Sequence, residues 1–139
     1  MSLKERILVH LEEHSTALFK TKNKIRDIEL IALSLINTLN NKGTIYWCGN
    51  GGSAADAQHL AAELVGRFKF ERPPISSIAL TTDTSVITSI GNDYGFSEVF
   101  ARQVSGLINK DDVLVVLSTS GNSPNILEAV KAAKAKSIK

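Results

Sequence analysis

The sequence predicts an α/β fold in which a parallel sheet is flanked by helices. Three short apolar runs, residues 44–48, 77–80 and 113–117, have the length of strands and show no clean alternation of polar and apolar side chains. Continuous apolar runs of this kind are typical of parallel strands that are buried on both faces. Stretches with helical spacing separate the runs, as the crossover connections of a parallel sheet require.

The first 40 residues are expected to form a helical arm, because apolar side chains recur there at helical spacing. The polar stretch Asn40–Gly43 ends the pattern. We therefore divide a single domain into an arm, residues 1–41, and an α/β core, residues 42–139. The apolar stripe needs a surface to cover it, either its own core or another subunit. It consists of Leu3, Ile7, Leu8, Leu11, Leu18, Ile25, Ile28, Ile31, Leu35 and Leu39.

Four further helices are expected in the core, at residues 53–66, 84–90, 97–108 and 124–136. Residues 137–139 follow directly after the last of them. A small open sheet of three strands would leave an edge exposed. We therefore expect the core to be truncated at its C-terminal end, with the natural chain continuing beyond it.

Composition narrows the function classes. The 139 residues carry a net charge of +2 without a dense basic block, so nucleic acid is not an expected partner. The charged N-terminus does not resemble a signal peptide, and no apolar stretch approaches the length of a membrane span. Cys48 is the one cysteine, which allows no internal disulfide and makes the cytoplasm the default location.

A loop of small residues, GNGGS at 49–53, follows the first apolar run. It matches the G-x-G-x-x-A dinucleotide fingerprint, but Asp83 lies too far along the chain to be the acidic residue of that motif. We interpret the loop as a place where a polyhydroxylated ligand lies against exposed backbone. Asn50 and Ser53 could form hydrogen bonds to its hydroxyl groups. The alternative is a tight turn, with Ser53 and Asp56 forming a loose capping box.

A second loop, STSGNS at 118–123, follows the third apolar run and is rich in hydroxyls. Ser123 and Pro124 suit a helix start, and one serine is enough to cap it. A helix cap therefore does not account for the other hydroxyl residues of the loop, Ser118, Thr119 and Ser120. Hydroxyl and amide groups at a helix N-terminus can hold a phosphate, so we favour a phosphate site over a simple cap.

His59 and Glu63 lie four residues apart, on one face of the helix that the first loop begins. Glu63 suits a general base, and the two side chains also suit zinc, although two ligands do not complete a site. An exposed surface pair is the alternative.

Other polar residues have weaker patterns. Asn92 and Asp93 are either a polar pair at the mouth of a pocket or a turn before a helix. Arg67 and Arg72 flank the link to the second run, where either could meet an anion.

Taken together, these motifs resemble the sedoheptulose 7-phosphate isomerases of the sugar isomerase (SIS) domain family. The resemblance extends over essentially the whole chain, including the arm. It is carried by residues 49–53, 56–59, 63–64, 66–67, 91–96 and 118–123.

The resemblance implies a flavodoxin-like parallel sheet and a homotetramer whose N-terminal helices pack between subunits. It also implies interconversion of D-sedoheptulose 7-phosphate and D-glycero-D-manno-heptose 7-phosphate, toward the ADP- or GDP-heptoses of surface polysaccharides such as lipopolysaccharide. Glu63 would be the catalytic base, and His59 with Glu63 would bind one zinc ion per subunit. The phosphate would contact Ser118, Thr119, Ser120 and Ser123, and the sugar would contact Asn50, Gly51, Gly52, Asn92 and Asp93.

The sequence departs from the family in one respect. Family members carry a later helix whose Gln and His complete the site, and no residue of this chain is assigned those roles. The 139-residue chain alone is therefore expected to be inactive. Two non-enzymatic alternatives are a relative that binds the replication initiator and a sugar-phosphate-sensing regulatory module. Glu63 and the two complete loops argue against the first, and the absence of a visible DNA-binding domain argues against the second.

Overall fold

The computed structural model describes residues 1–139, which form two compact units, Met1–Leu33 and Ser34–Lys139. The first unit contains helix α1 (Leu3–Lys22) and the start of α2 (Ile25–Asn40). A capping box begins α1, in which the Ser2 hydroxyl and the Glu5 carboxylate each accept from the other residue's backbone amide. The expected helix is thus confirmed, but it is interrupted at Asn23 and Lys24.

The second unit is built on a parallel sheet of three strands in the order β2-β1-β3. The strands are β1 (Ile45–Gly49), β2 (Ser77–Ala79) and β3 (Val113–Leu117), so all three strand predictions are confirmed. Ile45 pairs with Ser77 on one side and with Val113 on the other. All five residues of β1 are buried, as expected for a central strand with both faces covered.

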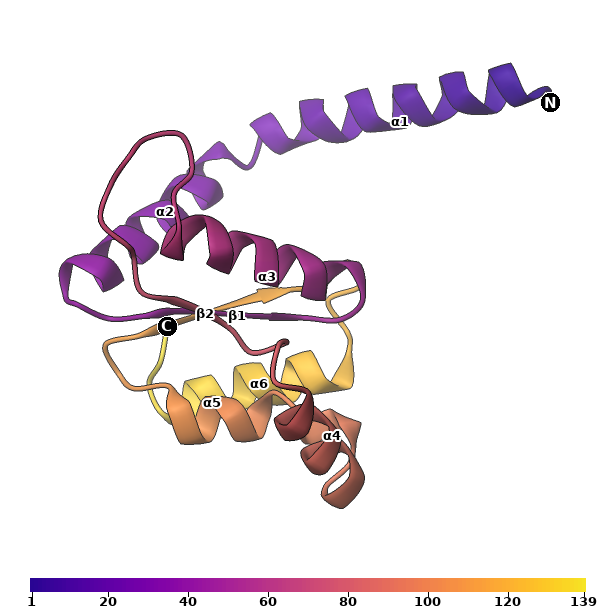
Figure 1. The fold of residues 1–139 in the computed structure, drawn as a ribbon. Coiled ribbons are helices and arrows are strands. Elements are labelled where there is room, and N and C mark those ends of the chain that lie inside the picture. The colour runs from indigo at the N-terminus through magenta and orange to yellow at the C-terminus, as the bar shows by residue number, and fades with distance from the viewer. The chain divides into compact units, whose positions relative to one another are not determined.

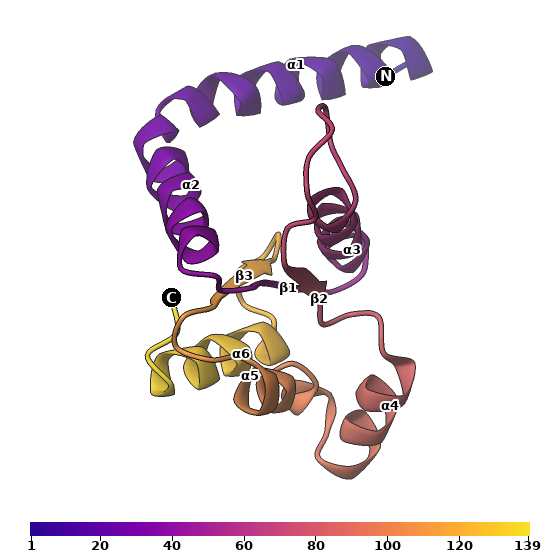
Figure 2. The same ribbon diagram turned by 60° about the vertical axis from the view of Figure 1, so that its left-hand side comes forward.

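Helices cover both faces of this sheet (Figure 1). Helix α3 (Gly52–Val65) and the end of α2 lie on one face, where Trp47 packs with Ala57 and Leu39. Helices α5 (Ala101–Leu107) and α6 (Pro124–Ala135) cover the other face, as a second view also shows (Figure 2). The core on that face includes Tyr46, Cys48, Val99, Phe100, Val104, Ile108, Ile126 and Ala129.

Helix α4 (Thr84–Asp93) and the short 3-10 helix η1 (Phe96–Glu98) connect β2 to α5. The sequence predicted one helix from residue 97 to 108, whereas the structure forms the 3-10 turn first and starts α5 at Ala101. Gly95, with a φ of 91°, turns the chain between α4 and η1.

Polar side chains fix the strand ends within this core. The Trp47 indole donates to the Ser77 hydroxyl over 2.8 Å, which links β1 to β2. The buried Asp112 carboxylate accepts from the backbone amides of Thr44, at 2.7 Å, and Asn109, at 2.8 Å. These bonds satisfy groups that would otherwise be unpaired where the chain enters β1 and β3.

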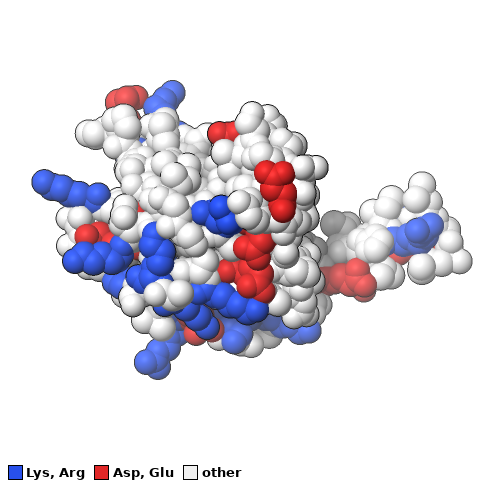
Figure 3. All heavy atoms as spheres, turned by 90° about the horizontal axis from the view of Figure 1, so that it is seen from below, with Lys and Arg blue, Asp and Glu red and all other residues white.

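Charged side chains of both signs appear on the face shown in Figure 3, with uncharged surface between them. No helix is both long enough and apolar enough to cross a bilayer.

Candidate active site

Both small-residue loops lie at the carboxyl edge of the sheet (Figure 1). Strands β1 and β3 are neighbours and run in the same direction, with Gly49 paired with Leu117 at their ends. The first loop leads from β1 into α3, and the second leads from β3 into α6. Ligands of open parallel sheets bind at this edge, where two helix N-termini also contribute partial positive charge.

The first loop needs its glycines for the turn itself. A Cβ atom on Gly49 would lie 2.7 Å from atoms of Ser53, and Gly51 has a φ of 56°, which other residues rarely adopt. Gly51 is the N-cap of α3, and no side chain caps this helix. The capping box considered for Ser53 and Asp56 is therefore wrong. The tight turn is real, and it leaves the helix start without a side-chain partner.

A reciprocal pair of amide hydrogen bonds joins the first loop to α6. Asn50 Nδ2 donates to Asn125 Oδ1 over 2.9 Å, and Asn125 Nδ2 donates to Asn50 Oδ1 over 2.8 Å. Asn125 is only 2% exposed. The sequence analysis missed Asn125, although a polar residue directly after Ser123 and Pro124 was a visible signal.

The second loop uses two of its hydroxyls to hold its own backbone. Ser118 Oγ accepts from the amide of Gly121 over 3.1 Å, and Ser120 Oγ accepts from the amide of Asn122 over 3.2 Å. Ser123 is the N-cap of α6, followed by Pro124 as predicted, but its side chain makes no capping bond. Each hydroxyl can still donate its own hydrogen to an anion.

Glu63 and His59 lie on one face of α3, with 3.5 Å between Glu63 Oε1 and His59 Nε2. The Glu63 side chain is 30% exposed and that of His59 is 75% exposed. Glu63 and His59 could provide two metal ligands. No group of three or more His, Cys, Asp or Glu side chains is placed to hold a metal ion. The residues of this chain alone therefore do not form a complete zinc site.

Glu63 belongs to the last turn of α3, whereas the first loop adjoins the first turn. The helical rise of about 1.5 Å per residue places Glu63 about 16 Å along the axis from Gly52. That separation exceeds the hydrogen-bond reach of about 3 Å that a general base needs. Glu63 therefore makes no direct hydrogen bond to the first loop of its own chain.

Arg72 and Arg67 have structural partners. Arg72 donates to the carbonyl oxygens of Glu63, at 2.7 Å, and Leu64, at 2.8 Å, and so caps the C-terminal end of α3. The guanidinium of Arg67 lies 3.8 Å from the Glu71 carboxylate in an exposed pair. The structure thus shows Arg72 as a cap of α3, and the suggested anion contacts of both arginines stay predictions.

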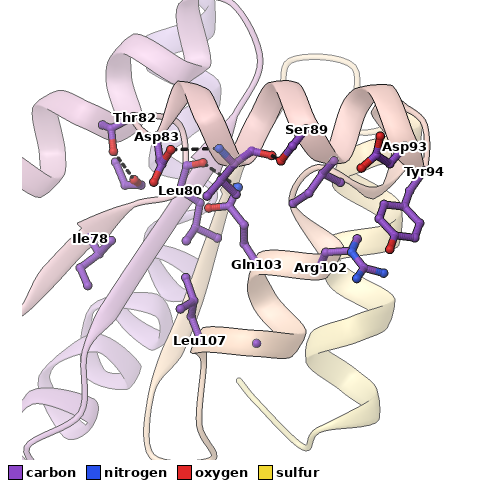
Figure 4. A pocket seen from close by; sticks show the side chains of 14 residues that line it. Ile78, Leu80, Thr82, Asp83, Ser89, Asp93, Tyr94, Arg102, Gln103 and Leu107 are labelled. Atoms are coloured by element: carbon purple, nitrogen blue, oxygen red, sulfur yellow. Dashed lines mark hydrogen bonds between the residues drawn. The ribbon is translucent and has the colours of Figure 1, made fainter.

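Asn92 and Asp93 form the end of α4, so the alternative of a turn before a helix is wrong. Asn92 Nδ2 donates to Asp93 Oδ1 over 2.8 Å. Asp93 lines a groove of about 720 Å³, together with Tyr94 and Arg102, whose guanidinium stacks 3.8 Å from the ring centroid (Figure 4). No residue of the two small-residue loops lines this groove.

Other polar residues are also committed to the fold. The Asp83 carboxylate caps α4 by accepting from the amide of Val86 over 2.9 Å. Gln58 Nε2 donates to the Thr81 hydroxyl over 3.1 Å and so ties α3 to the segment after β2. Burial raises the pKa of Cys48 to about 12, which keeps this residue a neutral thiol rather than a nucleophile.

Comparison with known proteins identifies the family. Residues 11–139 match the SIS domain family. The chain belongs to this family. It is similar to the phosphoheptose isomerases of Campylobacter concisus, with 54% identity over 95% of this chain and 70% of the relative, and of Helicobacter pylori, with 56% identity over 87% of this chain and 64% of the relative.

Solved structures of phosphoheptose isomerases have the same fold. The protein from Neisseria gonorrhoeae has a TM-score of 0.91 and 46% identity, over 99% of this chain and 72% of that one. The protein from Francisella tularensis has a TM-score of 0.95 and 42% identity, over 100% and 73% of the two chains. Within the SIS domain family, the chain therefore groups with the phosphoheptose isomerases, which confirms the resemblance and the fold class. It spans between 53% and 70% of the length of the first curated relatives.

Proposed function

We propose that the whole protein is an isomerase that interconverts D-sedoheptulose 7-phosphate and D-glycero-D-manno-heptose 7-phosphate. The reaction would supply ADP- or GDP-activated heptoses for surface polysaccharides, including lipopolysaccharide. The observation that carries the proposal is the placement of the hydroxyl-rich loop beside the bare-backbone loop, at the ends of adjacent strands β3 and β1. The kinship with phosphoheptose isomerases supports it.

The second loop is the proposed phosphate site. A phosphate there meets hydroxyl donors and the positive end of the α6 dipole, which together can bind an anion without Lys or Arg. The sugar hydroxyls would then lie against the first loop and the end of α4. The proposed phosphate contacts are Ser118, Thr119, Ser120 and Ser123, and the proposed sugar contacts are Asn50, Gly51, Gly52, Ser53, Asn92 and Asp93.

Glu63 is the proposed catalytic base. Its carboxylate takes the proton from the carbon next to the ketone carbonyl, which gives an enediolate, and returns the proton to the former carbonyl carbon. The hydroxyl proton of the first carbon passes to the former carbonyl oxygen in the same reaction. No external oxidant or reductant is needed, because the hydrogen moves between adjacent carbons of one molecule. Binding the phosphate at the opposite end of the substrate fixes which carbons face the base.

The length of α3 supports a site that is shared between copies of the chain. Glu63 lies about 16 Å along the axis from the start of its own helix, so a loop of another subunit is its proposed partner. We propose the homotetramer as the assembly. No residue of α1 is buried within the chain, and Leu3, Ile7, Leu11 and Leu18 are between 51% and 74% exposed, so this stripe is available for packing between subunits.

Zinc is the proposed cofactor, at one ion per subunit. His59 and Glu63 would be two of its ligands, and the others would come from outside this chain. A bound zinc ion would supply a positive charge for the enediolate oxygen. The cytoplasm is the proposed location, since the one cysteine is free and buried.

The test is turnover of sedoheptulose 7-phosphate by the full-length protein, followed by NMR with and without added zinc. Formation of the aldose phosphate is the expected result. A correctly folded full-length protein without turnover under either condition would favour a non-catalytic, ligand-binding SIS protein.

A further inference from the structure

We propose that Asn125 is a positioning residue that couples the two loops of the site, so that sugar phosphates bind more tightly than phosphate alone. The inference rests on the proposed function, in which the second loop binds phosphate and the first binds sugar. It gives a role to a buried side chain that the reaction itself does not use.

The geometry of the amide pair favours coupling. Asn50 lies in the first loop and Asn125 in the first turn of α6, 75 residues apart in the chain. Their two bonds, of 2.9 and 2.8 Å, connect the segments that follow β1 and β3. Two bonds between planar amides restrain orientation as well as separation, which one bond would not do.

The pair also leaves Asn50 able to bind a ligand. A side-chain amide has two N–H donors and an oxygen with two lone pairs. The bonds to Asn125 use one donor and one lone pair, so one of each remains on Asn50 for a sugar hydroxyl. Because Asn125 both donates and accepts, the orientations of the two amides are linked: the Asn50 amide cannot turn over alone without losing both bonds.

The buried hydroxyl of Ser77 provides a comparison. Ser77 Oγ accepts from the Trp47 indole over 2.8 Å at the start of β2, at the edge of the sheet opposite to the two loops. Both Ser77 and Asn125 are buried and satisfied, so loss of either should destabilise the fold. Loss of Asn125 alone should change how the two loops cooperate.

The experiment measures the Kd of inorganic phosphate and of sedoheptulose 7-phosphate by calorimetry. The full-length protein is compared with Asn125→Leu, Asn125→Asp and Ser77→Ala. We expect Asn125→Leu to bind phosphate within about twofold of the wild type but to bind the sugar phosphate about tenfold more weakly. Asn125→Asp still accepts from Asn50 Nδ2 but loses its own donor. Its charge near the phosphate should weaken both ligands, and the ratio of their affinities should change less than in Asn125→Leu. Ser77→Ala should lower Tm and leave the ratio of the two affinities unchanged.

An unchanged affinity ratio in the folded Asn125 variants would overturn the inference, and so would equal weakening of both ligands. If Asn125→Leu does not fold, the affinity ratio of Asn125→Asp tests the inference. Wild-type turnover on the same sample separates this test from the proposed function. A wild type that binds the sugar phosphate without converting it contradicts the isomerase, and the affinity ratio still tests the coupling. A wild type without preference for the sugar phosphate overturns the coupling.

Discussion

The guanidinium group of Arg72 holds the last turn of α3 by donating a hydrogen bond of 2.7 Å to the carbonyl oxygen of Glu63. A second bond, of 2.8 Å, reaches the carbonyl oxygen of Leu64. Carbonyl groups at a helix C-terminus lack intrahelical partners, and a cation there also complements the helix dipole. The proposed catalytic base therefore lies on a turn that is anchored from the following loop.

Replacing Arg72 should loosen this turn. We expect Arg72→Met to lower the free energy of unfolding by about 1–2 kcal/mol, because bonds from a charged donor to partly buried carbonyls are lost. Hydrogen exchange should accelerate at the backbone amides near residue 65. Arg67→Met is the control, since Arg67 has only an exposed pair with Glu71 at 3.8 Å. Equal effects of the two substitutions would contradict the capping role.

Removing hydroxyls from the second loop should weaken phosphate binding. We expect Thr119→Val and Ser120→Ala each to raise the inhibition constant of inorganic phosphate about tenfold, since each would lose a bond to a charged oxygen. Thr88→Val is the matched control, because the Thr88 hydroxyl donates to the Thr84 carbonyl oxygen in α4, at 2.6 Å. Unchanged phosphate inhibition in both loop variants would place the phosphate elsewhere.

Zinc binding should depend on His59 and not on a similar pair elsewhere. The His10 and Glu13 side chains of α1 lie 3.0 Å apart and are exposed, so His10→Ala reproduces the loss of a His–Glu pair. In zinc titrations of the full-length protein, we expect His59→Ala to weaken zinc binding about tenfold or more and His10→Ala to leave it unchanged. The zinc proposal fails if His59→Ala binds the metal as the wild type does.

A site shared between subunits predicts complementation. Glu63→Gln and the double variant Ser118→Ala/Ser120→Ala should each be impaired alone. Mixed oligomers formed by co-expression should regain about a quarter of wild-type activity, because random pairing joins an intact loop to an intact Glu63 in about one site of four. Activity no higher than that of the separate variants would instead place the loop and Glu63 of one chain in the same site.

The strands and both loops were predictable because local sequence determines them. Continuous apolar runs identified β1, β2 and β3, and the glycines identified the turn before α3. The break at Asn23 and Lys24 was not predictable, because the apolar spacing continues across it. The start of α3 was also predicted incorrectly. Gly51, with a positive φ, is the N-cap, so the helix begins at Gly52 rather than at Ser53.

The missed contacts of the site depend on tertiary structure. The pairing of Asn50 with Asn125 requires β1 and β3 to be neighbours, which no local pattern shows. Arg72 reaches the end of α3 only because the chain after Gly66 folds back on it. The spacing of His59 and Glu63 did predict a shared helix face, which the structure confirms.

The most direct test of the isomerase account is the loss of deuterium from C1-deuterated sedoheptulose 7-phosphate, measured by NMR with the full-length protein and its Glu63→Gln variant. We expect the wild type to remove deuterium from C1 as the aldose forms, with the label either transferred to C2 or exchanged with solvent while Glu63 carries it. Glu63→Gln should slow both processes by about a hundredfold to ten-thousandfold, because an amide cannot accept the proton. It should bind inorganic phosphate as the wild type does. Exchange and turnover at the wild-type rate in Glu63→Gln would contradict the account.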